Sequence, residues 1–164
     1  MRRLVASGFL RGMAMAALAG AIVLGALWGA ARVWHCRAER QWEVKKGELA
    51  AGAKAAEPIL AALEAYGRDE GHFPPALEDL LPKYLTAIPE PRFPFEAEWT
   101  YGPRADRDCF ALYVSVPHDY CPPAVVGWPL HFNDAFVYHS DGKYEPSDYG
   151  GILERIGAWA YYHE

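Results

Sequence analysis

The chain has 164 residues, of which 52% are hydrophobic and 23% charged, and its formal net charge is −5. This composition is that of a globular protein and excludes a collagen-like, coiled-coil or wholly disordered chain. The charge is uneven, because residues 1–34 contain four arginines and no acid, whereas residues 72–164 contain six bases and fourteen acids. A basic start therefore precedes an acidic body, and the acidic body argues against nucleic acid as a partner.

A long apolar run follows the basic segment, residues 1–11. The twenty residues from Gly12 to Ala31 include no charged, amide or hydroxyl side chain. As a helix with a rise of about 1.5 Å per residue they would extend about 30 Å, which is the thickness of the hydrocarbon core of a bilayer. We predict a transmembrane helix over residues 12–34, with membrane lipid as a partner. The alternative is a cleaved signal peptide, with the small residues 29–31 at its cleavage site.

The orientation of this helix is not set by charge alone. Three arginines precede the span and five bases follow it: Arg32, Arg37, Arg40, Lys45 and Lys46. That count favours a cytoplasmic body, but a long domain is exported largely regardless of charge. We expect a single-pass protein of the inner (cytoplasmic) membrane with an extracytoplasmic, periplasmic C-terminal domain, because two cysteines of the body could form a disulfide.

Two cysteines support export. Cys109 and Cys121 have eleven residues between them, so a disulfide could join them if the segment forms a hairpin or loop. Disulfides persist outside the cytosol, and a bridge here would place the body in the periplasm or beyond. The alternative is two buried thiols. The third cysteine, Cys36, is then a free thiol or an intermolecular contact.

Residues 35–71 are predicted to form an extended amphipathic helix, because Ala, Glu, Lys and Leu predominate in them. Apolar residues recur at intervals of three and four and form one stripe: Leu49, Ala53, Ala56, Ile59, Leu60, Leu63 and Tyr66. We expect a kink or restart at Pro58, which removes one helical hydrogen bond. Gly71 fits a C-terminal cap.

The remaining residues, 72–164, begin with a proline-rich connection. Between these prolines the sequence predicts one short helix, with Pro75 at its first position and residues 76–81 after it. A strand is expected over residues 98–101, followed by a Gly102-Pro103 turn. Another is expected from Cys109 to Val116, where aromatic and β-branched residues alternate.

Two further elements complete the prediction. Residues 135–139 and 143–144 flank Ser140-Asp141-Gly142, and Asp-Gly between such runs predicts a hairpin turn. Residues 149–164 carry apolar side chains at helical spacing, which predicts a short amphipathic helix. Aromatic residues such as Trp159 and Tyr162 belong in a core by default, with a protein-binding face as the alternative.

This order of elements resembles type IV pilins and the pseudopilins of type II secretion, in which a long N-terminal helix is half in the membrane and half packed on a small antiparallel sheet. Residues 61–85, AALEAYGRDEGHFPPALEDLLPKYL, are followed by TAIP and are similar to the major (G type) pseudopilin. The resemblance covers about residues 55–115. The matching positions are Tyr66, Asp69, Gly71, Phe73, Pro74, Leu80, Leu81, Pro82, Tyr84, Leu85, Ile88 and Pro89.

The resemblance implies an α+β, pilin-like fold and protein partners, among them other pilin-like subunits. It implies no enzyme activity and no cofactor. The N-terminus departs from the family, because Gly8-Phe9 imitates its cleavage site but the third position is Arg11 and the fifth is Met13 instead of Glu. That Glu neutralises the N-terminal amine of a neighbouring subunit in a filament. The family's Asp-Pro-Trp-Gly is also replaced, by residues 90–93. We therefore expect a membrane-anchored structural or interaction protein rather than a true filament subunit.

A second hypothesis is an extracytoplasmic, membrane-tethered enzyme or metal-binding module. It would use histidines and aspartates of the body: His72, His118, His131, His139, Asp119, Asp134 and Asp141. No pair among them has the spacing of a zinc motif, and we expect no metal site. Cys121 near His118 would be a candidate nucleophile, but no local signature accompanies it. Pairing of Cys121 with Cys109 is the simpler interpretation.

Overall fold

Helix α1 extends from Arg2 to Ala53. The computed structural model describes residues 2–104, 108–117, 120, 134–145 and 152–163, except for the side chains of residues 2–19, 152, 153 and 163. The chain divides within α1 into two units, Met1–Gln41 and Trp42–Glu164.

In the first unit, α1 carries large exposed apolar side chains. They are Ile22, Val23, Leu24, Leu27, Trp28, Val33 and Trp34, each more than half exposed. Residues 12–19 of the predicted membrane span lie outside the residues whose side chains are described. Over the part of the chain that the structure describes, no helix is both long and apolar enough to cross a membrane.

The second unit begins with the end of α1 and continues through a helical break. After Ala53 come a 3₁₀ turn, η1 (Lys54–Ala56), and helix α2 (Glu57–Glu70), with Pro58 in its first turn. The expected restart at Pro58 is confirmed, because a proline at this position removes an N–H that has no helical partner anyway. The predicted cap is also confirmed: Gly71 has φ 76° and its N–H donates to the carbonyl oxygen of Gly67 at 3.0 Å.

The apolar stripe on these helices faces the core, as its spacing predicts. Five of its members are buried: Leu49, Ala53, Ala56, Ile59 and Leu63. The other two, Leu60 and Tyr66, are partly buried against the same cluster. Each fully buried leucine or isoleucine contributes about 1.5 to 3 kcal/mol to folding.

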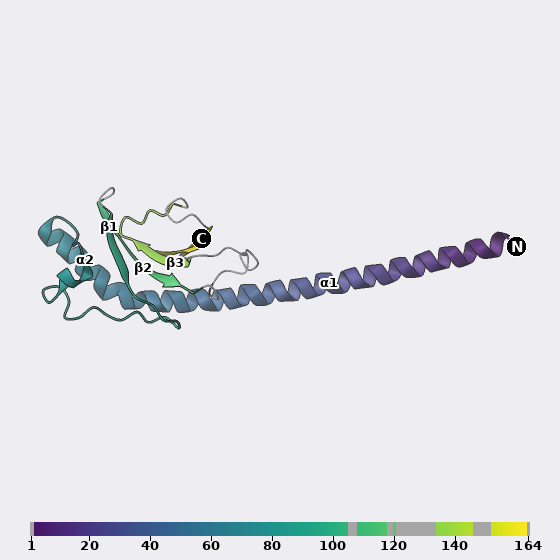
Figure 1. The fold of residues 1–164 in the computed structure, drawn as a ribbon, viewed down its shortest axis with the longest axis horizontal. Helices are drawn as coiled ribbons and strands as arrows, with labels where there is room; N and C mark the ends of the chain where they lie inside the picture. The colour runs from purple at the N-terminus through teal and green to yellow at the C-terminus, as the bar shows by residue number, and fades with distance from the viewer. Residues whose placement is uncertain (1, 105–107, 118–119, 121–133, 146–151, 164) are drawn as a thin grey trace. The chain divides into compact units, whose positions relative to one another are not determined.

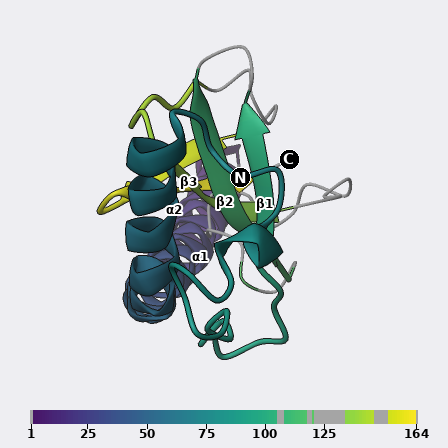
Figure 2. The same cartoon turned by 90° about the vertical axis from the view of Figure 1, so that its left-hand side faces the viewer.

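A five-stranded sheet forms the other layer of this unit. Its strands are β1 (Thr100–Arg104), β2 (Cys109–Val116), β3 (Asp134–His139), β4 (Ile152–Ile156) and β5 (Trp159–His163). Their order is β1-β2-β3-β5-β4 and all neighbours are antiparallel. Figures 1 and 2 show α2 lying beside β1–β3. The α+β class is therefore confirmed.

Alternate residues of each strand face opposite sides of the sheet. The residues that pack with the helices include Phe110, Leu112, Val114, Val116, Phe136, Trp159 and Tyr161. The opposite side has its own buried cluster, made of Ala111, Ala135, Val137, Ala160 and Tyr162. Each face of the sheet therefore carries a buried cluster. This places Trp159 and Tyr162 in the core, and the alternative of an aromatic binding face is wrong for these two residues.

Strand β1 does not end where the sequence predicts. The expected Gly102-Pro103 turn is wrong, because both residues lie inside β1 and pair with Ala111 and Phe110 of β2. Strand β1 is an edge strand, and proline, which has no N–H to donate, is accommodated at an edge where only one side of the strand is paired. The prediction for β2 is confirmed at both ends.

The turn of the predicted hairpin after β3 is present, but its second strand is not. Strand β3 begins one residue before the expected range. The turn is confirmed, since Gly142 has φ 65° and its N–H donates to the carbonyl oxygen of His139 at 3.0 Å. Residues 143–144 are not a strand. The reason is that β2 and β5 already pair with the two sides of β3.

The predicted C-terminal helix is wrong. Within residues 149–164 the structure has the β4–β5 hairpin, in which Ile156 pairs with Trp159 across Gly157 and Ala158. Gly157 has φ 65°, as the first position of a type II′ turn requires. The three-residue separation that suggests a helix here is the separation of partners across a two-residue turn.

The connection before β1 contains one short element. The 3₁₀ helix η2 (Leu77–Leu80) has Ala76 as its N-cap, so Pro75 does not occupy the first helical position. The carboxylate of Asp79 accepts a hydrogen bond from the Ala76 N–H at 3.1 Å. Leu77 and Leu80 are buried, which attaches this segment to the core.

Candidate functional site

A polar cluster joins the end of α1 to strand β4. The indole Nε1 of Trp42 donates to Oε2 of Glu154 at 2.6 Å, and Nζ of Lys46 donates to Oε1 of the same carboxylate at 2.9 Å. The Lys46 ammonium also lies 2.5 Å from Oε1 of Glu43. Hydrogen bonds to Glu43 and to Glu154 raise the pKa of Lys46. Glu154 therefore binds two donors from one face of the helix.

The contacts of Trp42 and Lys46 with Glu154 form one end of a seam between the helix and the sheet. This seam continues into the core. The ring of Trp42 meets Tyr161 edge-to-face, with ring centroids 5.2 Å apart. The hydroxyl of Tyr161 donates to the carboxylate of Asp134, which is itself buried. Asp134 thus accepts a hydrogen bond inside the core, an arrangement that offsets the cost of burying a carboxylate. These two contacts connect α1 to β5 and β5 to β3.

Sequence reasoning did not identify this seam. Trp42 lies seven residues before Leu49, so two helical turns back along the apolar stripe would have found it. No sequence pattern marks Glu154 as a partner of this helix, because the apolar spacing of its own segment predicts a helix instead of a strand. Its pairing with Trp42 and Lys46 depends on contacts between residues more than 100 positions apart.

A second polar cluster lies on the opposite face of the sheet. The His139 N–H donates to the hydroxyl oxygen of Tyr144 at 2.9 Å, and that hydroxyl donates to the carbonyl oxygen of Ala158 at 2.5 Å. The guanidinium of Arg155 lies 3.9 Å from the centre of the Tyr144 ring. Burial raises the pKa of Tyr144. Tyr144 therefore joins the end of β3 to the β4–β5 turn.

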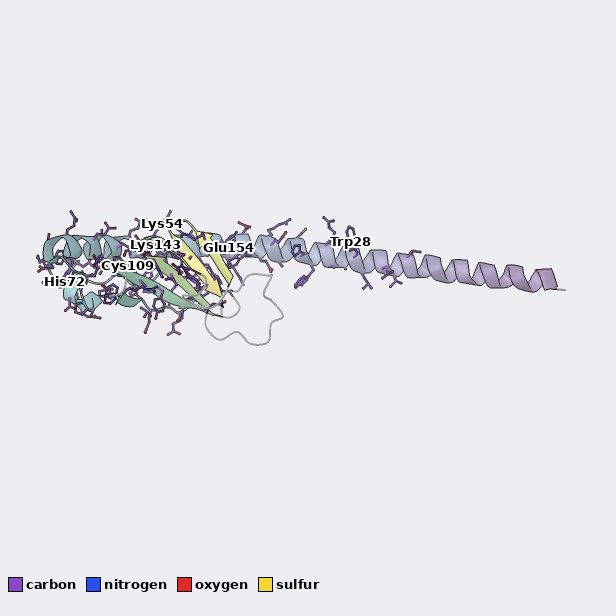
Figure 3. The ribbon with its side chains drawn as sticks, turned by 90° about the horizontal axis from the view of Figure 1, so that it is seen from above. Trp28, Lys54, His72, Cys109, Lys143 and Glu154 are labelled. Carbon is purple, nitrogen blue, oxygen red and sulfur yellow. The ribbon has the colours of Figure 1, made fainter. Side chains whose placement is uncertain are left out.

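The histidines and aspartates of the second hypothesis are only partly described. His139 is buried beside Tyr144, whereas Asp134 contacts Tyr161 in the cluster that faces the helices. His72 is exposed at the end of α2, apart from Glu154, as Figure 3 shows. Asp141 accepts a hydrogen bond from the Lys143 N–H at 3.0 Å within its turn. The other three, His118, Asp119 and His131, lie outside the described residues.

The structure does not bring these described residues together. Among the described parts of the chain, no three His, Cys, Asp or Glu side chains are grouped so that they could hold a metal ion. A shallow groove of about 340 Å³ does lie at the end of α2, where His72 and Phe73 meet Glu64, Arg68 and Asp108. The Nε of Arg68 donates to the carbonyl oxygen of Glu64 at 3.3 Å. The lining includes one histidine and two carboxylates, His72, Glu64 and Asp108, which are not grouped as ligands for a metal ion.

Two of the three cysteines, Cys36 and Cys109, lie within the described residues. Cys109 is buried at the start of β2. Cys121 lies outside the described residues, so the Cys109–Cys121 disulfide stays a prediction. Cys36 is exposed on α1.

The first unit presents a different kind of surface. Beyond its exposed apolar residues, Arg32 lies with its guanidinium carbon 4.9 Å from the centre of the Trp28 ring. His35 and Glu39 pair at 3.0 Å one turn further on. Figure 3 shows Trp28 projecting from the helix. This surface combines aromatic, apolar and basic groups on one helix.

Comparison with protein-family models, with curated proteins and with solved structures finds no match to this chain. Its functional assignment therefore rests on its own residues and their arrangement.

Proposed function

We propose that this chain is a membrane-anchored, pseudopilin-like structural or interaction protein with an extracytoplasmic body. The observation that carries the proposal is the change in character along α1 (Arg2–Ala53). Large apolar side chains are exposed between residues 22 and 34, whereas Trp42 and Leu49 are buried in the core of the second unit. One helix thus has a segment that suits lipid and a segment that suits a protein core.

The exposed apolar segment supports an anchoring role. Ile22, Val23 and Leu24 are consecutive and all exposed, and consecutive helical residues point about 100° apart. The apolar surface is therefore broader than the single stripe of a helix that packs on one core. Together with the uncharged run from Gly12 to Ala31, this distribution favours lipid as the surroundings of the segment.

The second unit supports a pilin-like body. Its helices pack on one face of an antiparallel sheet, and a proline-rich connection with the short helix η2 joins the two layers. The positions that resemble the major pseudopilin cluster in α2 and in this connection, and Tyr84 donates a hydrogen bond to Asp69 at 3.0 Å across them. Because Met13 replaces the assembly glutamate, the proposed role is anchoring and binding of protein partners, including pilin-like subunits.

Fractionation of cells that express the full chain tests the anchor. The intact protein should remain in washed inner membranes, and Ile22→Arg with Leu24→Arg should release a large fraction, because each central arginine costs about 2.5 to 3.5 kcal/mol in a membrane helix. The matched control is Val44→Arg, an exposed apolar position beyond the proposed span. A shortened, soluble wild-type product would contradict retention of the anchor and favour the signal peptide.

Cys36 allows a separate test of orientation, since its side chain is exposed. A membrane-impermeant maleimide added to intact spheroplasts should label the wild type and leave Cys36→Ser unlabelled. Labelling that appears only after lysis would place Cys36 in the cytoplasm and overturn the extracytoplasmic body.

A further inference from the structure

Three arginines gather on α1 at the end of its exposed apolar segment. Arg32, Arg37 and Arg40 are exposed and, with Val33 and Cys36, line an open groove of about 320 Å³. Arg32 and Arg40 are eight residues and therefore about 12 Å apart along the helix axis, and the three arginines lie within about 140° of its circumference. The arginines thus form a basic strip on one side of the helix, about 12 Å long.

The charge of this strip is only weakly opposed by its own helix. Residues 20–41 contain these three arginines and a single acid, Glu39. The Glu39 carboxylate is paired with His35 at 3.0 Å, and neither residue lines the groove. The strip therefore keeps a net positive charge that complements an anionic ligand.

The groups flanking the strip suit the edge of a bilayer. Trp28 and Trp34 are 65% and 57% exposed, and tryptophan is enriched at the level of lipid headgroups. The headgroup region of one leaflet is about 5 to 8 Å deep, so a strip about 12 Å long can cross it. A guanidinium presents a planar fork of N–H donors that binds two phosphate oxygens at once.

We infer that Arg32, Arg37 and Arg40 bind the phosphate headgroups of anionic phospholipids where α1 leaves the membrane. This inference rests on the proposed membrane anchor. Continuity of the strip with the exposed apolar segment favours a lipid over free phosphate, because acyl chains and headgroup then contact one surface. Headgroup binding also gives a role to the bases that follow the span, which the positive-inside rule leaves unexplained for an exported body.

Lipid retention by the full-length protein tests the inference. The protein is reconstituted into vesicles of phosphatidylethanolamine with phosphatidylglycerol and extracted in mild detergent, and the bound lipids are quantified. The wild type should retain phosphatidylglycerol above its share in the vesicles. The triple variant Arg32→Gln, Arg37→Gln, Arg40→Gln should bind it about a hundredfold more weakly, since three bases near an anionic surface together contribute roughly 3 kcal/mol.

A charge-matched control separates the strip from net charge. It replaces three exposed bases of the second unit by glutamine: Arg68, Arg92 and Lys143. This control should retain phosphatidylglycerol as the wild type does, and an equal loss would overturn the inference. Displacement of the lipid by added inorganic phosphate would likewise overturn it in favour of a general anion site.

The same experiment distinguishes failure of the headgroup site from failure of the proposed membrane anchor. A wild-type protein that stays in the vesicles but holds the two lipids in their starting ratio overturns the headgroup site alone. A wild-type protein that does not stay with the vesicles at all overturns the anchor and the headgroup site together.

Discussion

Gly52 of α1 lies directly against the ring of Phe93. A Cβ atom added at Gly52 would lie 2.3 Å from Cδ1 and from Cε1 of that ring, which is far inside van der Waals contact. The same ring contacts Phe95, Trp99 and Phe136. The proline-rich connection therefore packs on the helix through an aromatic side chain, and this packing requires a residue without a Cβ atom at position 52.

Gly52→Ala should lower the free energy of unfolding by about 1 to 3 kcal/mol, because overpacking displaces Phe93 from its aromatic neighbours. Alanine forms helices better than glycine by about 1 kcal/mol, so a loss of stability would isolate the steric effect. Gly47→Ala is the control, since no atom lies within 4 Å of an added Cβ there, and it should be neutral or stabilising. Urea denaturation of the three proteins measures the difference.

A double-mutant cycle checks the cause. Phe93→Ala should remove most of the penalty of Gly52→Ala, because the clashing ring is then absent. Additive losses from the two substitutions would show that the penalty arises elsewhere.

Glu154 is expected to contribute to stability through two separate donors, Trp42 and Lys46. Glu154→Ala should cost about 1 to 2 kcal/mol, because it leaves the indole N–H and the ammonium without this acceptor in a partly buried seam. Glu154→Gln should cost less, since its amide oxygen still accepts from Trp42. Equal losses for the two variants in urea denaturation would contradict a role for the indole hydrogen bond.

Alkaline pH should destabilise the second unit through its partly buried tyrosines. Burial raises the pKa of Tyr101, whose hydroxyl donates to the carbonyl oxygen of Pro74 at 2.8 Å, above the ordinary value of 10.0. The folded state then holds this proton more tightly than the unfolded state. The contribution of Tyr101 to the free energy of unfolding is therefore fully present below pH 10.0. It is lost as the pH rises toward the pKa of the folded state.

Tyr101→Phe should therefore flatten the alkaline decline in the free energy of unfolding, measured by urea denaturation at a series of pH values. Some decline should remain, because burial also raises the pKa of Tyr138 and of Tyr144. An unchanged slope in the variant would contradict the role of Tyr101.

The cap of α2 should be sensitive to substitution at Gly71. Its φ of 76° is left-handed, and a Cβ in this conformation costs about 1 to 2 kcal/mol. Gly71→Ala should lose about this amount in thermal or urea unfolding, and Gly71→Asn less, because asparagine tolerates the conformation better. Since no atom would crowd the new Cβ at Gly71, a neutral Gly71→Ala would argue against backbone strain as the cause.

The Cys109–Cys121 bridge predicts a thiol count. Of the three cysteines, only Cys36 should react under denaturing conditions without reductant. Reduction should then lower stability by about 3 kcal/mol according to the loop-entropy model. Three reactive thiols in protein prepared from washed inner membranes would exclude the bridge.

Local sequence was sufficient for the elements whose signals do not depend on distant partners. The alternation of aromatic and β-branched residues predicts strand β2, and apolar residues one helical turn apart predict the stripe that runs from α1 to α2. Pro58 and Gly71 marked the start and end of α2 because each acts through its own backbone. Composition and the uncharged run from Gly12 to Ala31 likewise need no tertiary information.

The pairing of the strands was decided only by tertiary structure. Ile156 and Trp159 are three residues apart both in a helix and across a two-residue hairpin turn, so their spacing alone does not distinguish the two. In the fold, Tyr161 of β5 packs on Trp42 and Glu154 of β4 accepts a hydrogen bond from the same indole. Those contacts join segments more than 100 residues apart, and it is their burial against α1, rather than any local preference, that selects the hairpin.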